Sequence, residues 1–320
     1  MRSLFIDIGN TVGRALNLSD LTSSSILSIL DISRSWYYRY LDPDPALDRR
    51  FNSSAVRDGD EWIVIGFKHR NPRMSHREIA YTLMDEDIAH LSPSTVYRIL
   101  KKHDLMTPWK HPQWASTRPE HAKHPDERWQ TDIMYIKIRG RFFYLLIFID
   151  EYSRYIVHHA LLISMDAGSV SLEAQAAIDI LRRDSIAEPV IQSDNGSSFI
   201  AMEFKLTLKA NNLTQKLIRP HTPEQNGIVE RSNKTTREAL VPIILVDYEQ
   251  AKSGISRIIE NYNNHRRHSS LQYLMPVQYY RGEPEILLAV REAKMEKAKS
   301  IRREENMKNR KGGVATGNLR

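Results

Sequence analysis

The sequence predicts an α/β protein whose core is a mixed sheet, and three observations lead to this fold class. Three successive stretches, 132–138, 142–149 and 155–162, are rich in β-branched and aromatic residues and have the length of strands. A helical pattern follows at 167–182. The flanking parts of the chain are mostly helical in pattern. We therefore expect one sheet-containing core between two helical regions.

The second half of the core alternates between short strands and helices. The apolar run at 189–191 ends in turn residues at 193–197, which predicts a strand followed by a tight turn. Residues 199–210 have helical character, and 213–218 alternate like an edge strand. A further helix is expected at 248–262.

The first part of the chain reads as short helices separated by turn signals. Two pairs, 25–30 with 33–41 and 75–84 with 92–103, predict helix, turn and helix. In the last of these helices, Ser92 before Pro93 is a favourable N-terminal signal. Val96, Ile99 and Leu100 form its apolar stripe, so the basic residues are expected to face outward. These basic residues are Arg98, Lys101 and Lys102. We expect them to bind DNA, and ordinary helical packing is the alternative.

These patterns predict four segments. Residues 1–115 form a helical DNA-binding region, 116–125 a linker, 126–282 the catalytic core with a trailing helix, and 283–320 a basic helical or disordered tail. The chain of 320 residues is long enough for more than one hydrophobic core.

Composition narrows the class of protein. There are 46 Lys and Arg against 39 Asp and Glu, a net charge of +7 that favours a polyanionic partner without proving one. Absence of cysteine excludes disulfides, thiolate chemistry and Cys-based zinc sites. The apolar run 142–149 is too short to span a membrane, and no secretory signal is evident. We expect a cytoplasmic, nucleoid-associated enzyme.

Three acidic residues lie in contexts that suit a metal-binding carboxylate. Asp132 interrupts a predicted strand, and Asp194 follows one at its carboxyl end, where open α/β sheets place ligands. Glu230 belongs to a helix that we expect to start at Thr222 and Pro223, with Gln225 completing a capping box.

Counting along that helix places Asn233, Lys234 and Arg237 on the face of Glu230. This face is basic and polar, so we expect it to meet phosphate rather than a core. Asp150, at the end of the run 142–149, is interpreted as structural.

Five stretches, in this order, resemble one known family. They are Trp129-Gln130-Thr131-Asp132, Asp150-Glu151-Tyr152-Ser153-Arg154, Ser193-Asp194-Asn195-Gly196, the stretch from Pro223 to Arg231, and the stretch from Tyr262 to Leu271. The chain resembles the DDE transposases of bacterial insertion sequences, whose core is similar to retroviral integrase. The motifs cover about half the chain, run more weakly into the first 110 residues, and stop after about Gly282.

The resemblance implies an RNase H-like core in which Asp132, Asp194 and Glu230 hold two Mg²⁺ ions, with Mn²⁺ as a substitute. Physical chemistry agrees. Two carboxylates about 4 Å apart repel by roughly 4 kcal/mol at an effective dielectric near 20, and oxygen ligands select hard divalent cations that relieve this repulsion. Such a pair of ions supports cleavage of DNA at transposon ends and joining of the 3′-hydroxyl to target DNA.

The resemblance and the placement of charge also predict DNA contacts. Besides the three basic residues at 98–102, we expect contacts from Asn195, Asn226, Arg231, Lys234, Arg237, Arg266 and Arg267. Joining two ends implies double-stranded DNA as partner, both transposon ends and target, and a homo-oligomer on paired ends.

Two other classes stay open. One is a helix-turn-helix DNA-binding regulator built on a catalytically inactive transposase. The presence of Asp132, Asp194 and Glu230 argues against it, because DNA binding alone does not require these acids. The other is a nuclease with the same core that cuts and does not join. The sequence alone does not distinguish DNA cleavage from DNA joining, and it does not identify the transposon-end sequence that is recognised.

Overall fold

The computed structural model describes residues 12, 22–30, 55–106, 121–219, 226–241 and 247–316. Contacts divide the chain into two compact units, Met1–Arg57 with Lys299–Arg320, and Asp58–Ala298. This division differs from the four segments expected from sequence, whose boundaries stay a prediction. In the first unit the short helix α2 (Ser23–Ile29) matches one expected helix, whereas its expected partner at 33–41 lies outside the described residues.

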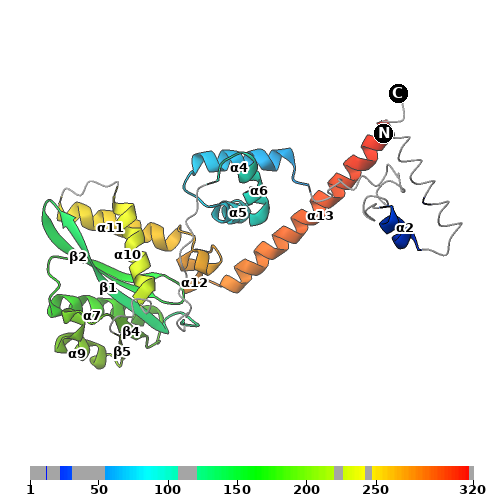
Figure 1. Cartoon of the computed structure of the whole chain (residues 1–320). Coiled ribbons are helices and arrows are strands. Elements are labelled where there is room, and N and C mark those ends of the chain that lie inside the picture. The colour runs from blue at the N-terminus through cyan, green and yellow to red at the C-terminus, as the bar shows by residue number, and fades with distance from the viewer. Residues whose placement is uncertain are drawn as a thin grey trace. The chain divides into compact units, whose positions relative to one another are not determined.

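The core of the second unit is a five-stranded mixed sheet with the strand order β3-β2-β1-β4-β5 (Figure 1). Strands β1 (Arg128–Ile138), β2 (Arg141–Asp150) and β3 (Ile156–Leu162) form an antiparallel meander. Strands β4 (Val190–Ser193) and β5 (Gln215–Leu217) join the other edge of β1 in parallel. This arrangement, with helices on both faces, is the RNase H-like fold that the sequence predicts.

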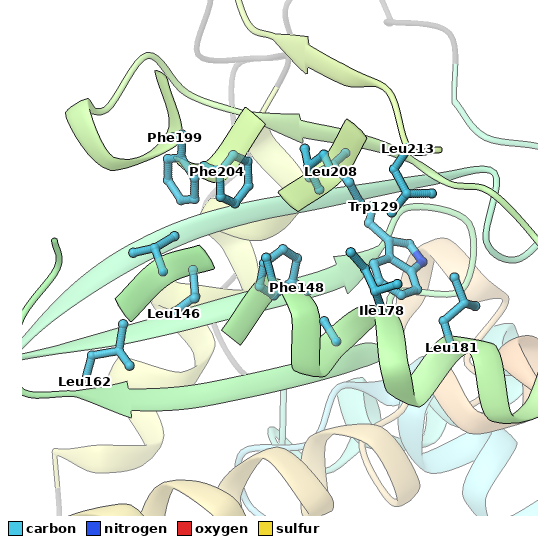
Figure 2. Close-up of a cluster of buried hydrophobic side chains, with 14 residues drawn as sticks. Trp129, Leu146, Phe148, Leu162, Ile178, Leu181, Phe199, Phe204, Leu208 and Leu213 are labelled. Carbon is cyan, nitrogen blue, oxygen red and sulfur yellow. The ribbon is translucent and has the colours of Figure 1, made fainter. Parts of the chain in front are cut away.

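One face of the sheet is covered by α7 (Ala167–Asp184), α8 (Ser197–Ile200) and α9 (Met202–Ala210). Trp129 and Phe148 of the sheet pack there against Phe199 and Phe204, as Figure 2 shows. The expected single helix at 199–210 is instead two helices, because Ala201 between them has an extended backbone with ψ 152°. The chain turns there, and both phenylalanines reach the same core.

The opposite face is covered by α10 (Gly227–Leu240) and α11 (Tyr248–Asn264). Side chains alternate across a strand, and in β1 the residues Met134, Ile136 and Ile138 pack on this face. Asp132, two residues before Met134, therefore points toward the same face. The alternation of the strand thus directs this carboxylate to the helix that carries Glu230.

Three helices precede the core within the second unit: α4 (Asp58–Arg70), α5 (His76–Asp85) and α6 (Pro93–Lys102). Ser75 and Glu78 form a capping box on α5, and the Ser92 hydroxyl accepts a hydrogen bond from Thr95 N at 3.2 Å. The stripe of Val96, Ile99 and Leu100 is buried, as expected. These caps and apolar stripes fix the pair α5 and α6.

After the core come a 3-10 helix (Ser269–Leu271), α12 (Pro276–Tyr280) and the long helix α13 (Pro284–Thr316). Helix α13 covers most of the segment 283–320 that was expected to be a basic helical or disordered tail. A membrane-crossing helix is absent from the described residues.

Candidate active site

Asp132 lies in the central strand, half-buried, with its carboxylate directed at α10. Its Oδ2 accepts a hydrogen bond from Asn233 Nδ2 at 2.8 Å, and its Oδ1 accepts one from the backbone N–H of Ile133 at 2.9 Å. Gln130, two residues earlier on the same face, accepts a hydrogen bond from Val229 N through Oε1 at 3.3 Å. These contacts fix β1 against the first turns of α10.

Asp194 follows the last residue of β4, the strand that pairs in parallel with β1. Its Oδ1 accepts a hydrogen bond from Gly196 N at 2.9 Å, which turns the chain into α8. A Cβ on Gly196 would lie 2.9 Å from that same oxygen. The small residue therefore allows the turn to hold the Asp194 carboxylate closely.

Glu230 is exposed in the first turn of α10. The described helix begins at Gly227, with Asn226 in the cap position. Residues 222–225, which carry the expected capping box, lie outside the described residues. The helical face also divides differently from expectation, because Asn233 is buried against Asp132 while Lys234 and Arg237 are exposed.

The three acids lie within electrostatic reach of one another. Burial and, to a smaller extent, the negative charges of Asp194 and Glu230 together raise the pKa of Asp132 to about 6, against the hydrogen bonds from Ile133 and Asn233. Partial desolvation at the start of α10 also raises the pKa of Glu230. The ionised carboxylates therefore repel one another, and a bound cation would relieve this repulsion.

The three carboxylates suit a hard divalent cation by their chemistry, whereas the distances between them are too long for one ion to contact all three. Among the residues that the structure describes, no three His, Asp or Glu side chains are close enough together to hold one ion. The three acids nevertheless supply only oxygen, and Asp132 and Asp194 accept few hydrogen bonds from the described residues. Oxygen ligands of this kind fit Mg²⁺ or Mn²⁺.

A second group of acids, which we call the saturated acids, is Asp126, Asp150 and Glu151. Asp150 is fully buried and accepts from Asp126 N at 2.9 Å and Ser153 N at 2.7 Å, as well as from the Ser153 hydroxyl. Asp126 accepts from Trp129, Tyr280 and Arg281. The interpretation of Asp150 as structural agrees with these contacts.

Three expected DNA contacts lie on the outer surface of α10. Arg231, Lys234 and Arg237 are exposed, and the last two share the helical face of Glu230 as the spacing predicted. Asn195 is exposed beside Asp194, with its amide donating to Ile218 O at 3.1 Å. These side chains are accessible to a polyanion.

Two other expected contacts are buried. Asn226 is 2% exposed, and its Oδ1 has no hydrogen-bond partner among the described residues. Arg267 has a side chain only 6% exposed, which donates to Asp85 and to Tyr273 O. Arg291 binds the same Asp85 carboxylate, with Nη2 to Oδ2 at 2.7 Å. In this arrangement neither Asn226 nor Arg267 offers surface to DNA, whereas the neighbouring Arg266 is exposed.

The basic residues of α6 all face outward, as expected. Arg98 and Lys101 are exposed, and Lys102 is exposed while pairing with Glu61 of α4 at 2.7 Å. His103 binds the same Glu61 carboxylate at 2.6 Å. Lys102 thus also contributes to the packing of α6 on α4.

Sequence reasoning missed the inward roles of Gln130 and Asn233. Strand alternation could have found Gln130, because it shares the face of Asp132. The i,i+3 spacing from Glu230 could have found Asn233, had the helix been placed against β1 rather than toward solvent.

Comparison with known proteins agrees with the fold. Two family models described as "Integrase core domain" match residues 122–223 and 211–276. An insertion element IS407 protein of Burkholderia multivorans is 25% identical over 222 residues, covering 68% of this chain and 78% of the relative. InsK of insertion sequence element IS150 from Escherichia coli is 22% identical over 272 residues, covering 79% and 92%. The transposase InsF of IS3, from the same species, is 25% identical over 166 residues, covering 50% and 55%.

Among solved structures, a chain of the simian T-cell lymphotropic virus intasome in complex with PP2A regulatory subunit B56 gamma matches with a TM-score of 0.46 and 16% identity, covering 70% of this chain and 75% of that one. The HTLV-2 integrase catalytic core in complex with magnesium matches with a TM-score of 0.40 and 18% identity, covering 49% and 97%. An integrase core therefore spans residues 122–276, and the chain is similar to transposases of bacterial insertion sequences.

Proposed function

We propose that this chain is a DDE-type transposase whose catalytic acids are Asp132, Asp194 and Glu230. The observation that carries the proposal is that the fold joins the three elements that bear these acids. Asn233 of α10 donates to Asp132 Oδ2 at 2.8 Å, and β4, which precedes Asp194, pairs in parallel with the strand of Asp132. Carboxylates with a purely structural role, such as that of Asp150, usually receive several hydrogen bonds from nearby donors. Instead the described residues leave much of the oxygen surface of Asp132, Asp194 and Glu230 without hydrogen bonds.

The three carboxylates would hold two Mg²⁺ ions, or Mn²⁺ in their place. When bound, such ions supply activation of the attacking oxygen and stabilisation of the leaving oxygen in an in-line displacement at phosphorus. Asp132 is kept in place by Asn233, and Asp194 by the turn at Gly196. Glu230 projects from the exposed start of α10, so rotation of its side chain would complete the set.

Two reactions use the same site. In cleavage, the oxygen of water bonds to phosphorus, the bond to the 3′ oxygen breaks, and that oxygen ends as a 3′-hydroxyl. In joining, the 3′-hydroxyl of the transposon end bonds to a phosphorus of target DNA and displaces the 3′ oxygen there. The exposed basic residues Arg231, Lys234, Arg237 and Arg266 would bind DNA backbone, and α6 would contact transposon-end DNA.

The test is a Mg²⁺-dependent assay with labelled transposon-end duplex. Strand transfer yields products longer than the substrate, whereas hydrolysis alone yields only shorter ones and would identify a nuclease. Each of Asp132→Asn, Asp194→Asn and Glu230→Gln is expected to lower the rate by at least about 10³-fold, the size of effect that loss of an electrostatic catalytic group produces.

DNA affinity of the three variants, measured without metal, is expected to stay within about 3-fold of the wild type, because the acids bind metal and not DNA. Asp247→Asn, which removes an exposed acid at the start of α11, is the matched control and is expected to keep full activity. Substantial cleavage by any of the three variants would contradict the assignment, and DNA binding without any cleavage would identify a regulator.

A further inference from the structure

The hairpin that joins β1 to β2 carries exposed aromatic rings at one end of the sheet (Figure 1). Tyr135 pairs with Tyr144 across the two strands and Lys137 pairs with Phe142, so these four side chains lie on one face. We refer to these four residues as the hairpin face. Tyr135 is 53% exposed and Phe142 is 56% exposed. Adjoining exposed apolar side chains, unlike single ones, indicate an interaction surface.

The rings of the hairpin face contact one another in a defined arrangement. Tyr135 meets Phe142 edge to face with ring centroids 6.2 Å apart, and it meets Tyr144 edge to face at 5.2 Å. The Tyr135 hydroxyl donates to Met165 Sδ at 3.3 Å, and the Lys137 ammonium lies 5.7 Å from the centre of the Phe142 ring. These contacts order the rings in the absence of a ligand, so little conformational freedom is lost when one binds.

The opposite face of the hairpin is anchored to the fold. Ile136 and Ile138 belong to the hydrophobic core that α10 and α11 cover, and the Phe143 ring lies 5.5 Å from that of Tyr248 in α11. Asp132 points toward that opposite face as well. The hairpin face is therefore distinct from the candidate active site.

The turn of the hairpin has an arginine at a position that favours other residues. Ile138 pairs with Arg141, which leaves Arg139 and Gly140 as the two turn residues. Both have a positive φ, 45° and 83°, as the turn that matches the twist of a hairpin requires. Glycine adopts this conformation freely and asparagine commonly does, whereas arginine adopts it at a cost. An unfavourable residue at an exposed turn points to a binding role for its side chain.

Positive charge surrounds the hairpin face. Lys137, Arg139 and Arg141 are exposed, and none of the three forms an ion pair with a described residue. Asp166 follows the methionine that Tyr135 contacts, but its two carboxylate oxygens cap α7, accepting from the backbone N–H and the hydroxyl of one serine at 2.9 and 2.8 Å. The surface is thus both aromatic and basic, which makes it complementary to a polyanion that has rings of its own.

A single strand of nucleic acid has these two properties together. Each nucleotide presents one phosphate and one unpaired base, and the base stacks on an aromatic ring irrespective of sequence. In a duplex the faces of the bases are already stacked on one another. We propose that the hairpin face, with Arg139 and Arg141, binds unpaired nucleotides of DNA, whose bases stack on Tyr135 and Phe142. This inference rests on the proposed function in taking DNA as the polymer.

The test is binding of a labelled single strand of about 12 nucleotides and of the same sequence as duplex, both measured without divalent metal. Tyr135→Ala and Phe142→Ala are each expected to weaken single-strand binding by about 10-fold, the effect of losing one stacked base. Duplex binding is expected to weaken by about 2-fold or less. Leu172→Ala, which removes an exposed apolar side chain of α7, is the matched control and is expected to change neither.

Two further substitutions at Phe142 separate stacking from simple apolar contact. Phe142→Trp keeps a flat ring and is expected to bind the single strand within about 2-fold of the wild type. Phe142→Leu keeps an apolar side chain without a ring and is expected to lose as much affinity as Phe142→Ala. Equal affinities of the tryptophan and leucine variants would overturn the stacking proposal.

Arg139→Asn separates a binding role from a structural one. Asparagine suits a positive φ, so the melting temperature is expected to be at least that of the wild type. The slope of log affinity against log salt for the single strand is expected to fall in magnitude by about 0.7, the contribution of one phosphate. Arg257→Ala, an exposed arginine on α11, is the matched control with an unchanged slope. An unchanged slope in Arg139→Asn would overturn the role of the turn.

Two other occupants of the hairpin face are outcomes of the same experiments. If a second copy of this chain binds there, Phe142→Ala would change the oligomeric state measured by light scattering and leave single-strand binding unaltered, and this result would overturn the proposal. Tighter binding of RNA than of DNA of the same sequence would overturn the DNA assignment.

The outcomes also separate this inference from the proposed function. If the wild type cuts transposon ends while the hairpin variants bind single strands as the wild type does, only this inference fails. If single-strand binding depends on the hairpin face while transposon-end DNA is not cut, the proposed function fails instead. A wild type that binds no single strand would overturn this inference directly.

Discussion

The core holds two groups of three acids that lie close in the fold and differ in what surrounds them. The saturated acids Asp126, Asp150 and Glu151 receive hydrogen bonds from backbone and side-chain donors on several elements. Asp132, Asp194 and Glu230 receive few from the described residues. A buried carboxylate with enough donors contributes to the fold, and one without them destabilises it until a cation arrives. The number of donors therefore separates the two groups, and burial separates them as well, since the saturated acids are buried whereas Asp132 and Asp194 are half-buried and Glu230 is exposed.

The largest expected effect tests the saturated acids. Glu151→Gln should lower the free energy of unfolding by about 3 kcal/mol, because Arg128 would lose its buried charged partner. Urea denaturation measures this loss. Glu230→Gln, at an exposed position, should change stability by no more than about 0.5 kcal/mol. Equal losses for the two variants would remove the distinction drawn between the groups.

The next effect tests the cation. Mg²⁺ should raise the melting temperature of the wild type, with a stabilisation of about 2.7 kcal/mol at a hundred times its dissociation constant. Asp132→Asn should abolish most of this gain, while Glu151→Gln should keep it. Because protons compete for Asp132, whose pKa is raised to about 6, the gain should shrink as the pH falls below that value. Calorimetry at several pH values, with and without chelator, measures it. A gain that persists in Asp132→Asn would argue against this site.

A smaller effect, of opposite sign to the first, tests the strain at Asp132. Without metal and near neutral pH, Asp132→Asn should stabilise the protein by about 1 kcal/mol, because the ionised side chain is disfavoured in the folded state. The pKa of this acid is raised from 3.8 to about 6. Its protonation therefore contributes fully to folding stability below pH 3.8, and this contribution is lost as the pH rises through 6. The advantage of the variant should accordingly appear over that interval.

Asp150→Asn is the matched control for that measurement. Burial likewise raises the pKa of Asp150 to about 6, yet its donors would then face the amide of asparagine, so this variant should be destabilised. If both variants shifted stability in the same direction, the surrounding donors would not be what distinguishes the two acids.

The smallest effect concerns the turn that holds Asp194. Gly196→Ala would place a Cβ 2.9 Å from Asp194 Oδ1 and displace that carboxylate. We expect Mg²⁺ affinity to fall about 3-fold, with metal-free stability changed by no more than about 0.5 kcal/mol. Titration calorimetry with Mg²⁺ measures the affinity. Gly254→Ala, where an added Cβ meets no atom within 4 Å, should leave it unchanged. An unaltered affinity in Gly196→Ala would show that the turn does not position Asp194.

Much of this comparison could be predicted from sequence, because strand composition and turn residues are local signals. The strands β1, β2 and β3, the helix α7 and the edge strand β5 fall where the patterns place them. The three acids were predicted from their local contexts and from the resemblance, and their catalytic role stays a proposal.

The remainder depends on contacts between distant segments, which local pattern does not contain. Asn233 turns inward because β1 places Asp132 opposite it, and Arg267 is buried because Asp85 lies beside it. The break at Ala201 arises because Phe199 and Phe204 share one core. In each case the spacing along the chain permitted several partners, and tertiary packing selected one.

The parallel pairing of β4 with β1 has a consequence for how the enzyme comes into being. Strands β1 to β3 are joined by short turns, whereas β4 reaches β1 across the whole of β2, β3 and α7. Long-range pairings of this kind form slowly during folding. The carboxylates of Asp132 and Asp194 would therefore come together only after the meander has formed. Pulsed hydrogen exchange would detect this order as later protection of the β4 amides than of those in β2.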